Sequence, residues 1–231
     1  MTPLATARAK PGHDALARLT FTCPLSSPRG YGLIEELGLT HGARIGDLGC
    51  GWAELLLRAL ERVPGTTGEG VDLDAAALER GRRNALERGL AARVQLERGD
   101  AAAWTARIGA FDALLCLGAS HALGGTEPAL IALRRMLRQD GRALLGEGFW
   151  TVPPTPGALA ALGVETEALT DLPGLIARAE AAGLRVVSAD AATQDEWDEF
   201  NALARTGERD AAYRDGYRGV LGFAYLVLAA A

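Results

Sequence analysis

Ala43-Arg44-Ile45-Gly46-Asp47-Leu48-Gly49-Cys50-Gly51-Trp52-Ala53-Glu54 is the stretch that decides the fold of this chain. Ile45 and Leu48 are typical of the end of a buried strand, and an acid stands between them. Gly49 and Gly51 permit a tight backbone turn and a close approach of a ligand to the backbone. Leucines and alanines then repeat with helical spacing. The stretch therefore predicts a strand, a glycine turn and a helix, which is the first half of a nucleotide-binding βαβ unit.

The residue at the start of this helix indicates which nucleotide the turn binds. A dinucleotide site has Gly-x-Gly-x-x-Gly, but Glu54 stands where the third glycine belongs. An acid in the first helical turn is unfavourable beside a pyrophosphate. A nucleoside cofactor without phosphates, such as S-adenosylmethionine (SAM), suits the turn better. The run 47–51 resembles motif I of the class I SAM-dependent methyltransferases, Asp/Glu-x-Gly-x-Gly-x-Gly, with Ala53 in place of the last glycine.

Acidic residues follow the next two predicted strands, 68–71 and 94–97. Asp72 lies where an acid accepts hydrogen bonds from ribose hydroxyls. Its alternative role is to cap the helix that follows, although Asp74 is better placed for that role. In the methyltransferases an acid after the third strand accepts a hydrogen bond from the adenine amine, and Asp100 resembles it. A Gly-Asp pair is also common in turns.

The resemblance implies a cofactor site for SAM, which would leave as S-adenosylhomocysteine (SAH). The residues it assigns to this site are Asp47, Gly49, Cys50, Gly51, Asp72, Leu73, Gly99, Asp100, Ala101 and Leu117.

Strand and helix patterns alternate through the middle of the chain. Further strands are predicted over 111–117 and 143–150, and the helix between them is expected to end at Gly141. We expect an α/β fold with a Rossmann-like, doubly wound sheet, mostly parallel, with an antiparallel last strand, helices on both faces and a small helical cap. The chain is expected to be one methyltransferase domain. Its parts would be an N-terminal helical lid over 1–42, a SAM-binding core over 43–150, and a cap with the last strands over 151–231.

Composition excludes several classes of protein. The net charge of −5 comes without a basic stripe, which argues against nucleic acid as a partner. The three cysteines match neither a disulfide framework nor a zinc spacing, and we assign no metal ligand. The N-terminus lacks the apolar core of a signal peptide, and the longest apolar run, 220–231, is shorter than the about 20 residues of a membrane span. We therefore expect a cytoplasmic protein with no membrane partner.

Two side chains are candidates for the catalytic step. His121 follows the fourth predicted strand, and histidine titrates near neutral pH, so it is the first candidate for a general base. Its alternative is a structural histidine in a loop. Glu147, near the end of the fifth strand, would hold the acceptor or act as a base; its alternative is a hydrogen-bonded acid at a strand end.

Four aromatic residues in the C-terminal third are candidates for the wall of an acceptor pocket: Trp150, Trp197, Tyr213 and Tyr217. They would suit an aromatic or apolar small molecule, or hold a cation. The alternative is that they pack the added helices onto the sheet. The sequence leaves the oligomeric state open, with a homodimer among the options.

Three functions compete. The first is a methyltransferase that moves the methyl group of SAM to an O, N, C or S atom of a small molecule. The second is a SAM-binding protein without methyl transfer, because cofactor motifs report binding and not turnover. The third is an NAD(P)-dependent oxidoreductase, which Glu54 and the lack of a Tyr-x-x-x-Lys pair disfavour, since Lys10 is the sole lysine.

Overall fold

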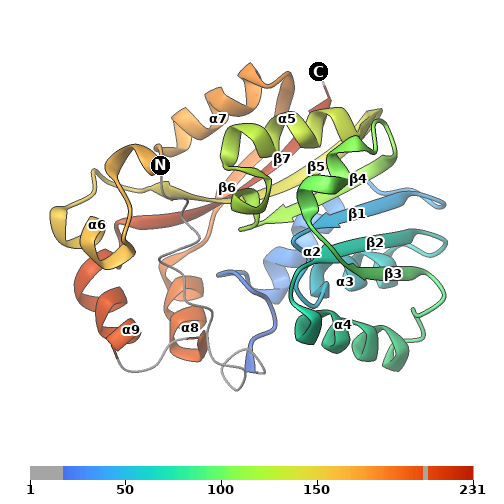
Figure 1. Cartoon of the computed structure of the whole chain (residues 1–231), viewed down its shortest axis with the longest axis horizontal. Helices are drawn as coiled ribbons and strands as arrows, with labels where there is room; N and C mark the ends of the chain where they lie inside the picture. Colours follow the sequence, from blue (N-terminus) through green and yellow to red (C-terminus); the bar gives the residue numbers. More distant parts are fainter. Residues whose placement is uncertain (1–17, 205–207, 231) are drawn as a thin grey trace.

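A seven-stranded sheet in the order β3-β2-β1-β4-β5-β7-β6 forms the centre of the molecule (Figure 1). The computed structural model describes residues 18–204 and 208–230. Strands β1 to β5 pair in parallel, whereas β7 is antiparallel to both β5 and β6. This confirms the Rossmann-like, mostly parallel sheet with an antiparallel last strand. The strands are β1 (Arg44–Leu48), β2 (Thr67–Asp72), β3 (Val94–Arg98), β4 (Phe111–Leu117), β5 (Leu137–Trp150), β6 (Leu184–Ala191) and β7 (Leu221–Ala230).

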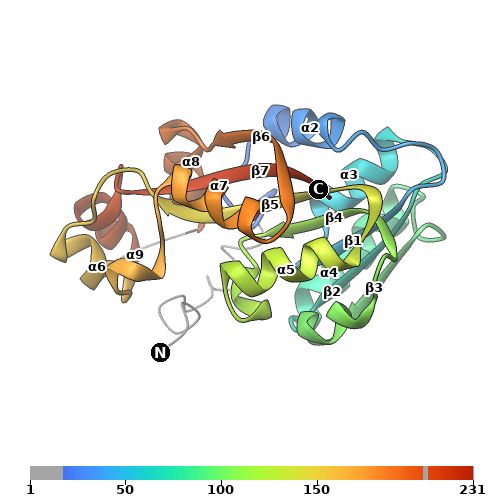
Figure 2. The ribbon, with the colours of Figure 1, turned by 90° about the horizontal axis from the view of Figure 1, so that it is seen from above.

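Helices cover both faces of the sheet, as Figure 2 shows for α2 and α3 on one side and α5 and α7 on the other. Side chains of α2, α3 and α4 join one apolar cluster with alternate residues of the strands, and side chains of α5 and α7 join the second. The layered helices are α2 (Ser27–Glu36), α3 (Glu54–Arg62), α4 (Ala75–Glu87), α5 (Thr126–Met136) and α7 (Leu172–Ala181), with the short 3-10 helices η2 (Ala101–Ala106) and η3 (Ser120–Leu123).

The boundary between α5 and β5 differs from the prediction. The helix ends at Met136 rather than at Gly141, and β5 begins at Leu137 instead of residue 143. Pairing with β4 shifts between Phe111↔Leu137 and Ala113↔Arg142, so β5 carries extra residues there. A Cβ on Gly141 would lie 3.0 Å from the carbonyl oxygen of Asp112. The glycine therefore marks a close backbone approach in an irregular strand pair, and the sequence pattern cannot distinguish this from a helix end.

In the described ranges, five helical elements besides α7 lie beyond β5, at the left of the sheet in Figure 1 with α8 below it. They belong to the segment 151–231, for which the sequence predicts a cap and the last strands. The elements are α6 (Pro156–Leu162), η4 (Thr166–Ala168), α8 (Gln194–Ala204), α9 (Glu208–Ala211) and the π-helical turn η5 (Ala212–Tyr217). The name "cap" below refers to α6, α8, α9 and η5.

The expected N-terminal lid lies partly outside the described residues, which begin at residue 18. Within 18–42 the structure has one complete helix, α2, which Ser26 caps through its side chain and which has a proline in its first turn. Residues 19–26 form no regular helix or strand. Over the described ranges, no helix combines the length and apolar character that crossing a bilayer requires.

Candidate cofactor and acceptor site

The glycine turn between β1 and α3 has a left-handed backbone at three positions. Gly49 has φ +68° and Gly51 has φ +55°, and Ala53, at the place of the third motif glycine, has φ 56°. A Cβ on Gly49 would lie 2.5 Å from the Cβ of Ala119, the residue beyond β4. The backbone N–H of Cys50 donates to Val71 at 3.0 Å, which ties the turn to β2. The turn therefore requires the first glycine for space as well as for conformation.

A cavity that is partly open to solvent lies against this turn. Leu117 of β4 contributes to its wall, and so does the segment before α2, which lies within the predicted N-terminal lid but whose residues were not among the predicted site residues. The lining residues are Phe21, Thr22, Cys23, Asp47, Gly49, Cys50, Trp52, Glu54, Leu55 and Leu117.

Asp47 is one of two buried acids that line this cavity, the other being Glu54, and 6% of its surface is exposed. Residue alternation along β1 places Asp47 on the same face as Ile45, the face of α2 and α3. Among the described residues, no group donates a hydrogen bond to its carboxyl. Burial, and then the nearby Asp72 carboxylate, raise the pKa of Asp47 to about 8. A cationic group of a ligand would complement this carboxyl.

Asp72 connects the end of β2 to the glycine turn. Its Oδ2 accepts the N–H of Gly51 at 2.7 Å, and its Oδ1 accepts the N–H of Asp74 at 2.8 Å. Each carboxylate oxygen keeps a second lone pair, so the side chain can still receive ribose hydroxyls. As predicted, Asp74 and not Asp72 caps α4, through the amides of Ala76 and Ala77.

The end of β3 lies next to the end of β2. The N–H of Gly99 donates to the Asp72 carbonyl at 3.1 Å. Asp100 is exposed and caps η2 through the N–H of Ala102 at 2.9 Å, while Ala101 is buried. Leu73 directly follows the end of β2 and is 64% exposed, so it presents apolar surface to solvent. The predicted adenine role of Asp100 is compatible with its capping role, because one carboxylate oxygen has no bond to η2.

The two catalytic candidates follow neighbouring strands, β4 and β5, but have different environments. His121 is exposed on η3. Glu147 is 7% exposed and lies on the α5 face of the sheet, opposite Asp47. Its carboxylate accepts from the Thr126 hydroxyl at 3.3 Å and from the N–H of Gly148 at 3.1 Å. These contacts, at the N-terminus of α5, fit the structural alternative for Glu147; both catalytic roles remain predictions.

The remaining groups around the turn are neutral or paired. Burial raises the pKa of the Cys50 and Cys116 thiols far above the ordinary value, so neither is a nucleophile. Glu54 forms ion pairs with Arg58 at 2.8 Å and Arg88 at 2.7 Å. Its charge is therefore balanced, and the electrostatic argument against a pyrophosphate is weaker than the sequence alone indicated.

The predicted acceptor aromatics are buried together. Trp197 stacks on Tyr213 with ring centres 6.2 Å apart, and Tyr213 meets the edge of Tyr217 at 5.4 Å. Trp150 donates its indole N–H to the Thr166 carbonyl at 2.9 Å. The three cap rings therefore pack on one another, and the role of all four aromatic residues toward an acceptor stays a prediction.

A Rossmann-like sheet with a glycine turn after its first strand is typical of nucleotide-binding folds. The model for a methyltransferase domain matches residues 45–141, from β1 to the irregular start of β5. The chain belongs to the class I SAM-dependent methyltransferases, a family that uses SAM as its cofactor.

Particular relatives resemble the chain along most of its length. The uncharacterized protein YjhP of Escherichia coli is 34% identical over 181 residues, which cover 78% of this chain and 72% of YjhP. Its crystal structure superposes with a TM-score of 0.83 over 94% of this chain and 98% of that one, at 27% identity. A SAM-dependent methyltransferase from Thiobacillus denitrificans, solved with SAH, gives a TM-score of 0.82 at 27% identity and covers 94% and 96%.

Proposed function

We propose that the chain transfers the methyl group of SAM to an O, N, C or S atom of a small molecule and releases SAH. The observation that carries the cofactor side is Asp47, a buried carboxyl that faces the cavity and receives no hydrogen bond from the described residues. A buried acid without a partner is costly unless a ligand supplies a donor or a positive charge. The α-ammonium group of SAM or SAH would supply both.

Residues at the ends of β2 and β3, next to the glycine turn, would bind the remaining parts of such a ligand. The second lone pairs of Asp72 would accept the ribose hydroxyls, and Asp100 would accept the adenine amine. Leu73 offers exposed apolar surface beside them for the flat face of a base. Gly49 and Gly51 have no side chains, which would let a ligand approach the backbone of the turn closely.

In this proposal the protein positions the reactants and excludes water. SAM carries an activated methyl group on its sulfonium sulfur. When the methyl group moves to the acceptor, the sulfur becomes the neutral thioether of SAH. Leu117 and the segment Phe21–Cys23 line the cavity and would shield the reacting atoms. His121 would remove a proton from an oxygen or nitrogen acceptor, and Glu147 would orient the acceptor or act as base.

Two polar atoms on α8 support a cap that binds the acceptor. The indole N–H of Trp197 and the side-chain oxygen of Asn201 are buried and have no hydrogen-bond partner. They lie four residues apart, on one side of the helix. An acceptor with a hydroxyl or amide group on an apolar body would satisfy both. Further along α8, Ala204 joins a cluster with Trp52 of the glycine turn, which places the helix beside the cofactor turn.

The proposal keeps the predicted division into an N-terminal segment to residue 42, a core over 43–150 and a cap with the last strands over 151–231. It also keeps the cytoplasm as the compartment. The three cysteines, all among the described residues, are buried and form no disulfide bond, which suits reducing conditions.

Calorimetric titration with SAH and SAM, and with NADH as the control ligand, tests the proposal. We expect micromolar binding of both sulfur ligands, weakened about 100-fold in Asp72→Ala because two charged hydrogen bonds to the ribose are lost. Asp74→Asn is the matched control, since asparagine is also a good helix cap and this position is not assigned to the ligand. Binding of NADH without SAH would contradict the proposal.

Transfer of tritium from methyl-labelled SAM into a small-molecule extract then distinguishes a methyltransferase from a SAM-binding protein without turnover. We expect label in the extract with the wild type, and less with His121→Ala at unchanged SAH affinity. Tight SAH binding without any transfer would favour the non-methylating alternative.

A further inference from the structure

The segment Leu19–Ser26, here called the cofactor wall, is fixed at its first end by the glycine turn and α4. The indole N–H of Trp52 donates to the Thr20 carbonyl at 2.8 Å, and the Arg80 guanidinium donates to the Leu19 carbonyl at 2.7 Å. The same guanidinium lies 4.0 Å from the ring centre of Trp52. The wall is thus attached to the turn that forms the floor of the cavity.

At its second end, the cofactor wall is fixed by residues near the end of the chain. The Tyr225 hydroxyl, from β7, donates to the Pro24 carbonyl at 2.6 Å. The N–H of Ser26 donates to Oε1 of Glu196, on α8, at 3.1 Å. Between the two ends, Phe21, Thr22 and Cys23 line the cavity.

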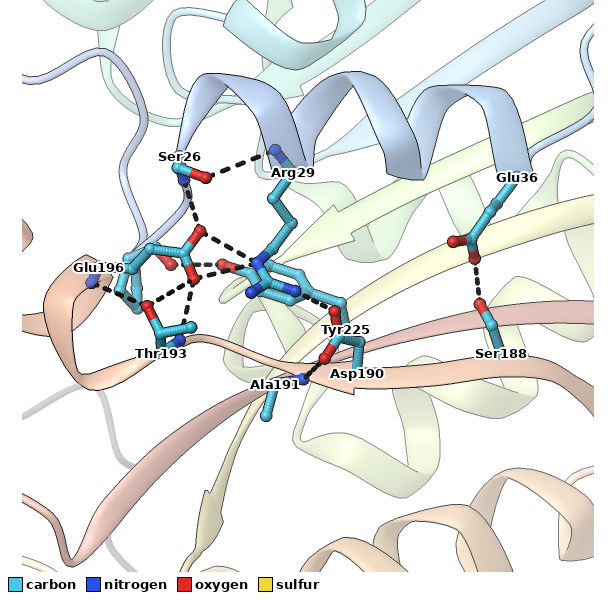
Figure 3. A network of polar contacts seen from close by, with 10 residues as sticks. Ser26, Arg29, Glu36, Ser188, Asp190, Ala191, Thr193, Glu196 and Tyr225 are labelled. Carbon is cyan, nitrogen blue, oxygen red and sulfur yellow. Dashed lines mark hydrogen bonds and ion pairs between the residues drawn. The ribbon is translucent and has the colours of Figure 1, made fainter.

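Glu196 serves two elements with its two carboxylate oxygens (Figure 3). Oε2 accepts the N–H of Thr193 at 2.9 Å, and the Thr193 hydroxyl accepts the N–H of Glu196 at 3.2 Å, which makes a capping box at the start of α8. The Arg29 side chain, from α2, donates through Nε to both oxygens at 3.0 Å. The same guanidinium also contacts Asp190 of β6.

The ion pair is well shielded. Side-chain exposure is 18% for Arg29 and 9% for Glu196. Burial raises the pKa of Glu196, but the hydrogen bonds from Arg29 and Ser26 lower it more. The pKa is therefore below its ordinary value, and the carboxylate stays charged. The contacts of Glu196 are therefore charge-assisted, which makes this joint between α2, α8 and the cofactor wall a strong one.

We propose that Glu196 and Arg29 are positioning residues for the cofactor: their ion pair holds the Ser26 end of the cofactor wall, so that Phe21–Cys23 close the cavity. This rests on the proposed function, because it requires that the cavity binds SAM and SAH. Trp197, a candidate acceptor contact, is the residue after Glu196 on α8. A movement of α8 on acceptor binding would therefore be transmitted to the cofactor wall through the side chain of Glu196.

The test compares Glu196→Gln with Glu199→Gln, an exposed acid on the same helix. Glutamine is accepted at the third position of a capping box, so Glu196→Gln keeps the start of α8 and removes the charge that pairs with Arg29. We expect about tenfold weaker binding of SAH by calorimetry for Glu196→Gln and for Arg29→Met, and unchanged binding for Glu199→Gln. The double variant is expected to lose no more than either single one, since both remove one contact.

A second measurement separates positioning from general stability. Hydrogen exchange of the Ser26 amide is expected to be slowed further by SAH in the wild type but not in Glu196→Gln. Tyr225→Phe removes the other contact at this end without touching α8, and it is expected to weaken SAH binding in the same direction even if Glu196→Gln folds poorly. SAH affinity unchanged in folded Glu196→Gln and Tyr225→Phe would overturn the proposal. A wild type that does not bind SAH would overturn the proposed function as well.

Discussion

At the scale of single residues, Asp47 makes cofactor binding sensitive to pH. Its pKa of about 8 means that the carboxyl is largely protonated at neutral pH in the absence of ligand. A bound ammonium group favours the carboxylate, so binding expels a proton. We predict that the dissociation constant of SAH falls as the pH rises, by at most about tenfold per pH unit, and levels off above a pH of about 8.

Calorimetry from about pH 6 to pH 8.5 measures this slope. Asp47→Asn should bind more weakly at high pH and show a flat profile. The sign is opposite for stability without ligand: because the folded-state pKa is raised, the contribution of Asp47 is present below about pH 4 and lost as the pH rises through 8. A dissociation constant that rises with pH in the wild type would contradict the assigned role.

Gly49 and Gly51 share a left-handed backbone but differ in the space around them. Alanine at Gly49 would place its Cβ 2.5 Å from Ala119, whereas at Gly51 the nearest atom is Cγ2 of Thr22 at 3.4 Å. We predict that Gly49→Ala lowers the free energy of unfolding by roughly 3 kcal/mol, from strain and overpacking together, and Gly51→Ala by about 1 kcal/mol, from strain alone. Denaturant titration measures both, and equal losses would show that overpacking plays no part.

At the scale of elements, α8 contains a buried polar side chain that lowers stability and that we propose contacts the acceptor. Asn201 is 1% exposed, and its side-chain oxygen lacks a partner. We predict that Asn201→Leu raises the free energy of unfolding by about 1 kcal/mol, since it removes an unsatisfied buried polar atom and improves helix propensity, yet lowers methyl transfer.

Asn84→Leu, in the interior of α4 and only partly buried, is the matched control for propensity. It should give a smaller gain in stability and leave methyl transfer unchanged. If Asn201→Leu kept full methyl transfer, the acceptor role of that side chain would be wrong.

At the scale of the whole molecule, a ligand in the cavity touches parts of the chain that are distant in sequence. The lining comes from residues 21–23, from 47–55 and from Leu117. Binding should therefore stabilise the fold as a unit. We predict that SAH at 100 times its dissociation constant adds about 2.7 kcal/mol, which raises the melting temperature by roughly 5–10 °C. Thermal unfolding with SAH and with NADH checks this, and an equal shift with NADH would argue against a site selective for SAM.

Local patterns determined the Rossmann-like core. The strand, glycine turn and helix at 43–60 follow from apolar spacing and from glycines that bear positive φ, as the structure confirms. Motif I, carried by 47–51, gave the family, and Asp74 was recognised as the cap of α4 because N-cap chemistry is local. Even the capping box of α8, which went unrecognised, is visible as Thr193-x-x-Glu196.

Only the tertiary structure decided where distant groups meet. It put Glu147 on the opposite face of the sheet from Asp47 and gave it partners in α5, which strand ends alone do not reveal. It placed Phe21–Cys23 over the cavity and joined Ser26 to Glu196 across 170 positions of sequence. The physical reason is that periodicity and capping depend on neighbours along the chain. Burial, pKa shifts and ion pairs instead depend on which surfaces the packed sheet brings into contact.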